Sequence, residues 1–274
     1  MSARTGASAP AVLLESLDKG VLTLTLNRPE RLNSFNVELH AALIGAFERA
    51  RSDERCRAVL LTGAGKGFCA GQDLSDRSVA PGAARPDLGE SLENRYNPLI
   101  RTMKALPKPI VCAVNGAAAG AGANIALACD IVLAAKSAKF LQAFARIGLL
   151  PDCGGTWALP RLVGEARARA AILLAEPIDA ERAEAWGMIY RAVDDEALAN
   201  EARAIAEKLA CGPTYGYALI KQALNASSTN GLNAQLDLER DLQRKAGLSD
   251  DYAEGVRAFF EKRAPNFAGR GPAQ

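Results

Sequence analysis

The chain has 274 residues, enough for one large domain or for one domain with a helical appendage. Apolar residues make up 49% and charged residues 23%, a globular balance that excludes disorder as the main state. The 33 basic and 31 acidic residues leave a net charge of +2, so we expect no nucleic-acid partner. No run approaches the roughly 18 apolar residues of a membrane span, so we expect no membrane partner.

The rarer residue types narrow the chemistry further. The six cysteines lack any C-x-x-C spacing and several lie in apolar runs, so we expect reduced, buried thiols in a cytoplasmic protein. His40 is the single histidine, which excludes a histidine-rich metal site. We predict no metal, and we interpret His40 as a surface residue of a helix. Residues 1–10 lack the apolar segment of a signal peptide and are predicted to form a flexible tail.

Strands and helices alternate through the first half of the chain. Two β-rich runs, 12–17 and 21–26, flank a turn signal and predict a hairpin. Further strands are predicted at 57–62, 110–114 and 131–134, with helices from Leu39 to Ala50, at 91–106 and at about 120–129. Segment 63–89 has no periodicity and is predicted to be a long loop, of a length that is usually functional or mobile. This order predicts an α/β fold with right-handed crossovers.

The second half of the sequence is mainly helical. Helices are predicted at 155–163, 165–175, 179–186, 195–211, 213–226, 231–246 and 249–262, with a short strand near 189–193. The composition shifts near residue 200. We therefore expect a core over 11–200 and a helical C-terminal region over 201–274.

Three glycine-rich junctions are candidates for a functional site. In the first, Gly67 to Leu74, small residues around Gly71 let a ligand approach the backbone and leave the amide of Gln72 as a donor; an ordinary tight turn is the alternative. The second, Asn115 to Asn124, opens a helix whose first amides lack internal partners and can hold an anion or a polarised carbonyl oxygen. It lacks the G-x-G-x-x-G pattern and the Walker lysine. Close packing of helix on sheet through small residues is the alternative interpretation, and it is compatible with a functional role.

The third junction, Gly148 to Trp157, contains one carboxylate, Asp152, between an apolar run and a glycine pair. Such a residue can cap the helix that follows, or face a cleft as an acid/base group with a raised pKa. The local pattern leaves both interpretations open.

Together these junctions resemble the crotonase (enoyl-CoA hydratase/isomerase) superfamily from about Gly20 to Phe267. The blocks that carry the resemblance are Asn27-Arg28-Pro29, Leu32-Asn33-Ser34-Phe35, Phe68-Cys69-Ala70-Gly71-Gln72-Asp73-Leu74, Lys108-Pro109, Asn115-Gly116, Cys129-Asp130-Ile131 and Leu150-Pro151-Asp152-Cys153-Gly154-Gly155-Thr156. The resemblance implies a crotonase-like spiral of ββα turns with a helical C-terminal oligomerisation region. It also implies a homo-trimer or hexamer and an acyl-CoA thioester substrate. No separate cofactor is expected, because coenzyme A is part of the substrate.

The resemblance also assigns site residues. It implies an oxyanion hole formed by the backbone amides of Gln72 and Ala121, which would stabilise a thioester enolate without a titrating side chain. The substrate-binding residues that it implies are Arg28, Arg31, Ala70, Asp73, Leu74, Asn124 and Phe144. From residue types alone, the two arginines could meet the CoA phosphates or form exposed salt bridges. Asp73 lies in a polar loop, where a solvated turn carboxylate is the simpler interpretation.

The acid/base positions separate the reactions within the superfamily. Hydratases carry two glutamates that activate water, and this chain has Asn124 and Phe144 at the matching positions, so simple hydration is not expected. Asp152 matches the single carboxylate of isomerase-type relatives, which suits a proton shuttle between two carbons.

The surrounding motifs are similar to those of isomerases that open the ring-1,2-epoxide of phenylacetyl-CoA to an oxepin and that also show Δ3,Δ2-enoyl-CoA isomerase activity. Phe144 would suit an aromatic acyl group. The alternatives are an enoyl-CoA hydratase that uses Asp152 with another partner, and a non-catalytic binding protein on the same fold.

Overall fold

Two β-sheets form the core of the computed structural model, which describes residues 11–76 and 87–272. The larger sheet has the strand order β1-β2-β3-β5-β7-β10. Its members are β1 (Leu13–Asp18), β2 (Val21–Leu26), β3 (Ala58–Gly63), β5 (Ile110–Val114), β7 (Ile131–Ala135) and β10 (Arg191–Val193). The smaller sheet has the order β4-β6-β8-β9. Its members are β4 (Gly67–Cys69), β6 (Ala117–Ala119), β8 (Lys139–Leu141) and β9 (Ile178–Asp179).

The chain passes alternately through the two sheets. β3, β5 and β7 pair in parallel in the larger sheet, and each is followed along the chain by β4, β6 or β8 of the smaller sheet. Each turn of chain therefore adds one strand to each sheet. The predicted α/β spiral of ββα turns is confirmed. The hairpin of β1 and β2 is antiparallel, as predicted, and β1 forms the exposed edge.

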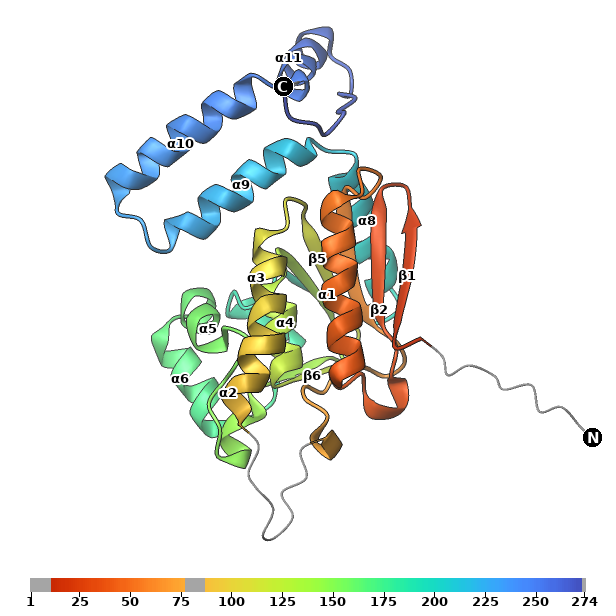
Figure 1. Cartoon of the computed structure of the whole chain (residues 1–274), viewed down its shortest axis with the longest axis vertical. Coiled ribbons are helices and arrows are strands. Elements are labelled where there is room, and N and C mark those ends of the chain that lie inside the picture. Colours follow the sequence, from red (N-terminus) through yellow and green to blue (C-terminus); the bar gives the residue numbers. More distant parts are fainter. Residues whose placement is uncertain (1–10, 77–86, 273–274) are drawn as a thin grey trace, which may run out of the picture.

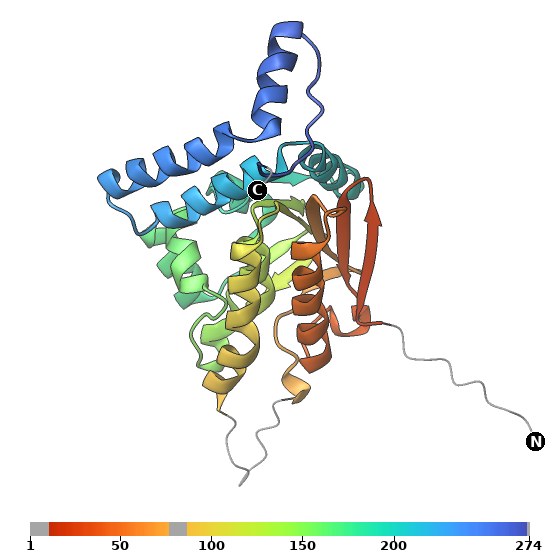
Figure 2. The ribbon, with the colours of Figure 1, turned by 45° about the horizontal axis from the view of Figure 1, so that its top comes forward.

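Helices cover both faces of the larger sheet (Figures 1 and 2). α1 (Val37–Ser52), which Asn36 caps, and α3 (Asn97–Ala105) lie on one face, and α8 (Leu198–Ala210) packs against β3, β5 and β7 on the other. The near-continuous burial of β3, β5 and β7 explains their apolar runs, because a parallel sheet covered on both faces has no solvent side. α4 (Ala121–Ala128) is buried along its whole length.

Several elements differ from the sequence-based prediction. β4, β6, β8 and β9 have two or three residues each and were not predicted. The helix expected at 91–106 begins earlier, with α2 (Leu88–Ser91), and passes through a π-helical turn (Leu92–Tyr96) before α3. Part of the predicted 63–89 loop, residues 77–86, lies outside the described residues, as does the predicted tail 1–10.

The prediction that His40 lies on the surface is wrong. Its side chain is on the inner face of α1 and is only 2% exposed. The imidazole ring packs edge-on against Tyr96, with 4.2 Å between centroids, and lies 4.6 Å from the ring of Phe35. Tertiary contacts with residues from two other segments of the chain bury it.

The remaining helices follow the second half of the chain. α5 (Gly155–Val163), α6 (Glu165–Leu174) and α7 (Ala180–Ala185) precede α8. α9 (Thr214–Ser227), α10 (Leu232–Gly247) and α11 (Asp250–Glu261) then extend away from the sheets, as Figure 2 shows. α8 packs on the larger sheet and therefore belongs to the core. The helices that stand apart from the core begin at α9.

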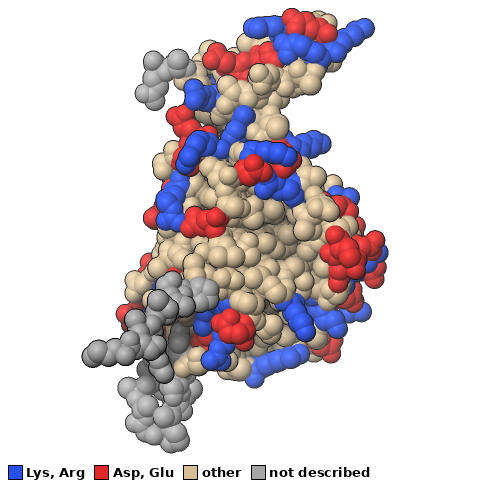
Figure 3. All heavy atoms as spheres, turned by 90° about the vertical axis from the view of Figure 1, so that its right-hand side faces the viewer, with Lys and Arg blue, Asp and Glu red and all other residues tan. Residues whose placement is uncertain are grey.

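The surface and the thiols agree with a folded protein of balanced charge. On the face shown in Figure 3, basic and acidic side chains are interspersed around an uncharged band.

All six cysteines lie in the described part of the chain and are free; five are buried, as predicted, whereas Cys211 is exposed. In the described residues, no helix is long and apolar enough to cross a membrane. Nor does this part of the chain contain a cluster of His, Cys, Asp or Glu side chains that could hold a metal ion.

Candidate active site

The end of β4 and the start of α4 approach each other very closely. Gly71 has φ +90°, and a methyl group at this position would lie 2.8 Å from the carbonyl oxygen of Ala119 and 3.4 Å from the amide nitrogen of Ala121. A methyl group at Gly122 would overlap the carbonyl oxygen of Cys69. The glycines are therefore required by close contact between two backbone segments. This contact brings the amides of Gln72 and Ala121, the predicted oxyanion donors, into one region.

Both of these amides belong to well-fixed segments. The residues on either side of Gln72 bond to Phe35, which donates its N–H to the Gly71 oxygen (2.7 Å) and accepts from the Asp73 amide (2.9 Å). Ala121 is the first residue of α4, so its N–H is one of the donors for which a helix provides no acceptor. Two such donors can stabilise a developing oxyanion without reorganising.

A buried aromatic cluster, which the sequence analysis did not identify, supports the first of these segments. The hydroxyl of Tyr96 donates to Oε1 of Gln72 at 2.9 Å, and Nε2 of Gln72 donates to the carbonyl of Phe35 at 3.0 Å. Tyr96 in turn packs against His40 and Phe35. A single tyrosine in an irregular helical stretch gives no local signal for this role.

Asp152 lies just before α5, half-buried, with its Oδ1 atom shielded from solvent. The helix begins at Gly155 and Gly154 occupies the cap position, so Asp152 is not its N-cap residue. The main-chain oxygen of Asp152 accepts hydrogen bonds from the Gly155 amide and from Nδ2 of Asn124, both at 2.9 Å. Burial, reinforced by the adjacent Asp152 carboxylate, raises the pKa of the Cys153 thiol.

Asn124 and Phe144, at the two positions where the resemblance leads us to expect glutamate in a hydratase, both lie near the N-terminal half of α4. Asn124 is buried on α4, and its Oδ1 accepts from Nε2 of Gln142 at 2.8 Å. Phe144 is buried in a 3-10 helical segment (Ala143–Ile147); a methyl group at Gly120 would lie 3.7 Å from its Cζ atom. The Phe144 ring thus flanks the N-terminus of α4.

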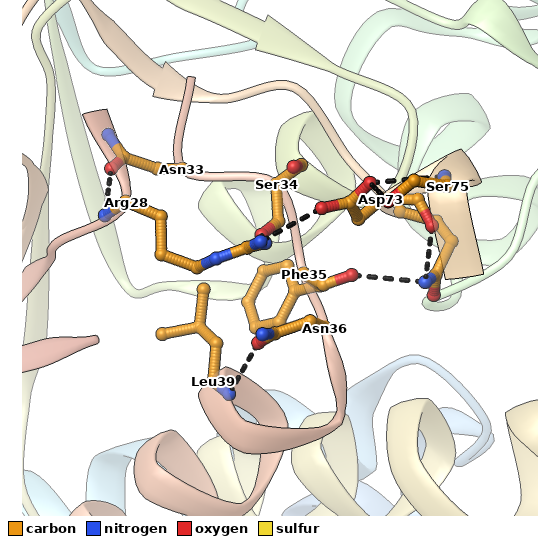
Figure 4. A network of polar contacts seen from close by, with 9 residues as sticks. Arg28, Asn33, Ser34, Phe35, Asn36, Leu39, Asp73 and Ser75 are labelled. Carbon is orange, nitrogen blue, oxygen red and sulfur yellow. Dashed lines mark hydrogen bonds and ion pairs between the residues drawn. The ribbon is translucent and has the colours of Figure 1, made fainter. Parts of the chain in front are cut away.

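Arg28 and Asp73 form a partly buried network that Figure 4 shows. The Arg28 guanidinium donates to the carbonyl of Ser34 at 2.5 Å and to Asp73 at 2.9 Å. The interpretation of Asp73 as a solvated turn carboxylate is wrong, because only 7% of the residue is exposed. The hydrogen bond from Ser75, aided by the ion pair with Arg28, lowers the pKa of Asp73 to about 2. This network anchors the chain immediately after Gln72, and the hydrogen bond from the Phe35 amide to the Gly71 oxygen anchors it immediately before.

The other predicted substrate-binding residues lie near this network but differ in exposure. Arg31 ends a 3-10 turn (Pro29–Arg31) and is exposed, as is Leu74. Ala70 is half-buried, and its amide donates to the carbonyl of Leu32 at 2.9 Å. Of the two arginines, only Arg31 therefore has a solvent-facing side chain.

Comparison with known proteins agrees with this geometry. A family model described as "Enoyl-CoA hydratase/isomerase" matches residues 16–270. The chain is 59% identical to the 1,2-epoxyphenylacetyl-CoA isomerase of Escherichia coli, over 94% of this chain and 98% of that protein. It is 49% identical to a protein of Rhodobacter capsulatus named as a probable enoyl-CoA hydratase, over 93% and 96% of the two chains. The crystal structure of an enoyl-CoA hydratase from a Polaromonas species superimposes with a TM-score of 0.88 at 35% identity, covering 93% of this chain and 99% of that one.

The fold and the paired backbone segments define a protein of the crotonase class. The chain belongs to the enoyl-CoA hydratase/isomerase family. Of these relatives, the one that is 59% identical is named as an isomerase.

Proposed function

We propose that this enzyme isomerises acyl-CoA thioesters, with the ring-1,2-epoxide of phenylacetyl-CoA as its substrate and the oxepin thioester as product. The observation that carries the proposal is the carboxylate of Asp152, tied through its own backbone to the helix that presents the Ala121 amide. The 59% identity to an isomerase named for this substrate supports the choice of acyl group.

The proposed reaction moves one proton between two carbons. Asp152 removes the proton next to the thioester carbonyl, and the resulting enolate oxygen accepts hydrogen bonds from the amides of Gln72 and Ala121. The carboxylic acid then returns the proton to a carbon further along the conjugated system while the epoxide opens to the seven-membered ring. The same proton transfer converts a 3-enoyl thioester into a 2-enoyl thioester. The proposed step is a redox-neutral proton transfer that a carboxylate and two hydrogen-bond donors can carry, so we propose no cofactor beyond the coenzyme A of the substrate.

The remaining assignments follow from position. Phe144, beside the start of α4, offers a flat apolar contact to an aromatic acyl group. Arg31 is exposed and free to meet a CoA phosphate, whereas Arg28 acts through Asp73 to hold the loop. The buried cysteines support a cytoplasmic location, which we propose on that ground.

The test is a side-by-side assay of purified protein against epoxyphenylacetyl-CoA, a 3-enoyl-CoA and a 2-enoyl-CoA. We expect turnover of the first two as isomerisations. If the protein binds all three thioesters and converts none, the binding-protein alternative replaces the proposal.

Hydration of crotonyl-CoA should be slow or absent. Neither the Asn124 amide nor the Phe144 ring can accept a proton from water, so the two-carboxylate activation of a hydratase is missing. The rate of hydration is measured as the loss of the enoyl absorbance when the 3-hydroxy thioester forms. Turnover within tenfold of an ordinary hydratase would show instead that Asp152 activates water with another partner.

We also propose that the chain assembles as a trimer or a dimer of trimers through α9–α11. These helices leave large apolar side chains in solvent, with Phe259 and Phe260 76% and 77% exposed, and an apolar hollow lies between α9 and α11. Exposed aromatic surface of this kind is typical of an interface. Light scattering at micromolar concentration should give the mass of three or six chains, and a monomer would refute the proposal.

A further inference from the structure

The side-chain amide of Asn124 is occupied at both ends by protein groups. Its Nδ2 atom donates to the main-chain oxygen of Asp152 at 2.9 Å, and its Oδ1 atom accepts from Nε2 of Gln142 at 2.8 Å. Asn124 is 2% exposed and Gln142 1% exposed. Hydrogen bonds in such a dry environment are strong and costly to leave unmade.

The chemistry of the partners fixes which way this amide points. A main-chain carbonyl can only accept, so Nδ2 must face Asp152 and Oδ1 must face Gln142. Only the Nε2 group of Gln142 can then donate to that oxygen. The Asp152 carbonyl therefore sets the orientation of the Asn124 amide, and Gln142 holds the opposite end of that amide by donating to its oxygen.

The Asp152 carbonyl is fixed by two donors. The Gly155 amide supplies the second hydrogen bond, also at 2.9 Å, so both lone pairs of the oxygen are used. A methyl group at Gly155 would overlap the Asn124 amide, which explains the glycine at the start of α5. The next residue, Cys153, has φ +52°, a backbone conformation that a non-glycine residue keeps only when its surroundings impose it.

Asn124 and Ala121 lie on one helix. They are three residues apart in α4. One helical turn therefore carries both the backbone amide of Ala121, the predicted oxyanion donor, and the side-chain amide that bonds to Asp152. The hydrogen bond from Asn124 therefore links Asp152 directly to the helix that carries the predicted oxyanion donor.

We propose that Asn124, held in place by Gln142, is a positioning residue that sets the Asp152 carboxylate against the oxyanion hole. This proposal rests on the proposed isomerase function and concerns the reaction specificity of the same site. A glutamate at position 124, ionised to activate water, has no donor for the Asp152 carbonyl. The position can therefore serve hydration or hold Asp152, but not both. Asn124 supplies the donor for the Asp152 carbonyl and cannot activate water, so it favours isomerisation over hydration at this site.

The test compares Asn124→Ala and Asn124→Asp with wild type on 3-enoyl-CoA. Alanine suits the alanine-rich α4, and aspartate keeps the size and the acceptor for Gln142 while removing the donor. Both variants should lose turnover by about 10- to 100-fold with KM nearly unchanged, as expected when a catalytic group is displaced by a fraction of an ångström to an ångström. Gln142→Met, which keeps volume without the donor, should lower kcat in the same direction.

A double-mutant cycle separates positioning from general structural support. If Asn124 acts through Asp152, adding Asn124→Ala to Asp152→Asn should lower kcat no further. Asn225→Ala is a control for the loss of an amide-to-carbonyl hydrogen bond away from the site, because the exposed Asn225 on α9 donates its side-chain amide to the main-chain oxygen of Lys104; its loss should leave kcat unchanged.

The possible outcomes distinguish the two proposals. Wild-type kcat in both Asn124 variants, or losses that multiply in the double mutant, would overturn the positioning role while leaving the isomerase function intact. A rise in KM at constant kcat would mean that Asn124 contacts substrate instead. If Asp152→Asn alone keeps full turnover, the acid/base assignment fails and the positioning role fails with it.

Discussion

Replacing Asp152 by asparagine should lower turnover by about 10²–10⁴, the usual contribution of a general acid/base group. Asparagine keeps the shape and polarity of the side chain but cannot accept the proton from the carbon next to the thioester. The amides of Gln72 and Ala121 remain in place, so affinity for acyl-CoA should change little. Steady-state turnover of epoxyphenylacetyl-CoA and calorimetric binding of a CoA thioester measure the two effects separately.

A structural aspartate provides the matched control for this substitution. Asp179 caps α7 by accepting the Arg182 amide at 2.8 Å, and asparagine ranks equal to aspartate at such a position. Asp179→Asn should therefore leave both stability and turnover near wild type. If Asp152→Asn behaves in the same way, Asp152 is not the proton shuttle.

Gly71→Ala should lower turnover by about 10²–10³, the loss typical of removing one oxyanion donor. The new methyl group would lie 2.8 Å from the Ala119 carbonyl oxygen, closer than van der Waals contact allows, and the neighbouring atoms are backbone rather than mobile side chain. The end of β4 would move away from α4, so the amides of Gln72 and Ala121 could no longer meet one oxygen. Turnover of 3-enoyl-CoA reports this loss.

The backbone strain of an alanine with a positive φ must be separated from the steric clash. Gly187 also has a positive φ, +74°, but a methyl group there meets only the Leu162 oxygen, at 3.5 Å. Gly187→Ala should therefore lower thermal stability modestly and leave kcat of the folded enzyme unchanged. Equal kcat in the Gly71 and Gly187 variants would count against an oxyanion hole at the β4–α4 contact.

The main elements of the fold could be predicted because each imposes its own local pattern. β3, β5 and β7 are buried on both faces and so appear as apolar runs, and Asn36 marks the start of α1 through its capping side chain. The strands of the smaller sheet have two or three residues, too few to show a period of two. Their pairing depends on the stacking of successive turns, which no single segment encodes.

The site was predictable only as far as family resemblance and local chemistry reach. The glycine-rich junctions and the lone carboxylate Asp152 mark candidate segments in the sequence, and the family resemblance is what assigned roles to Gln72, Ala121 and Asp152 within them. The burial of Asp73 depends on Arg28, 45 residues away, and the role of Asn124 depends on a carbonyl 28 residues away. Gln142 follows a short strand with no signal of its own, and only the fold places its amide against Asn124.

The six cysteines allow local unfolding of the protein to be measured by chemical labelling. Cys211 is exposed, whereas the five buried cysteines include Cys69, whose pKa burial raises to about 12. Alkylating reagents attack the thiolate, so the native protein offers them one accessible target and the unfolded chain offers six. After the fast labelling of Cys211, the slow labelling of the buried cysteines therefore measures how often the sheets or α4 open transiently. Cys69 packs against Gly122 at the β4–α4 contact, so its labelling rate measures how often the candidate active site opens transiently.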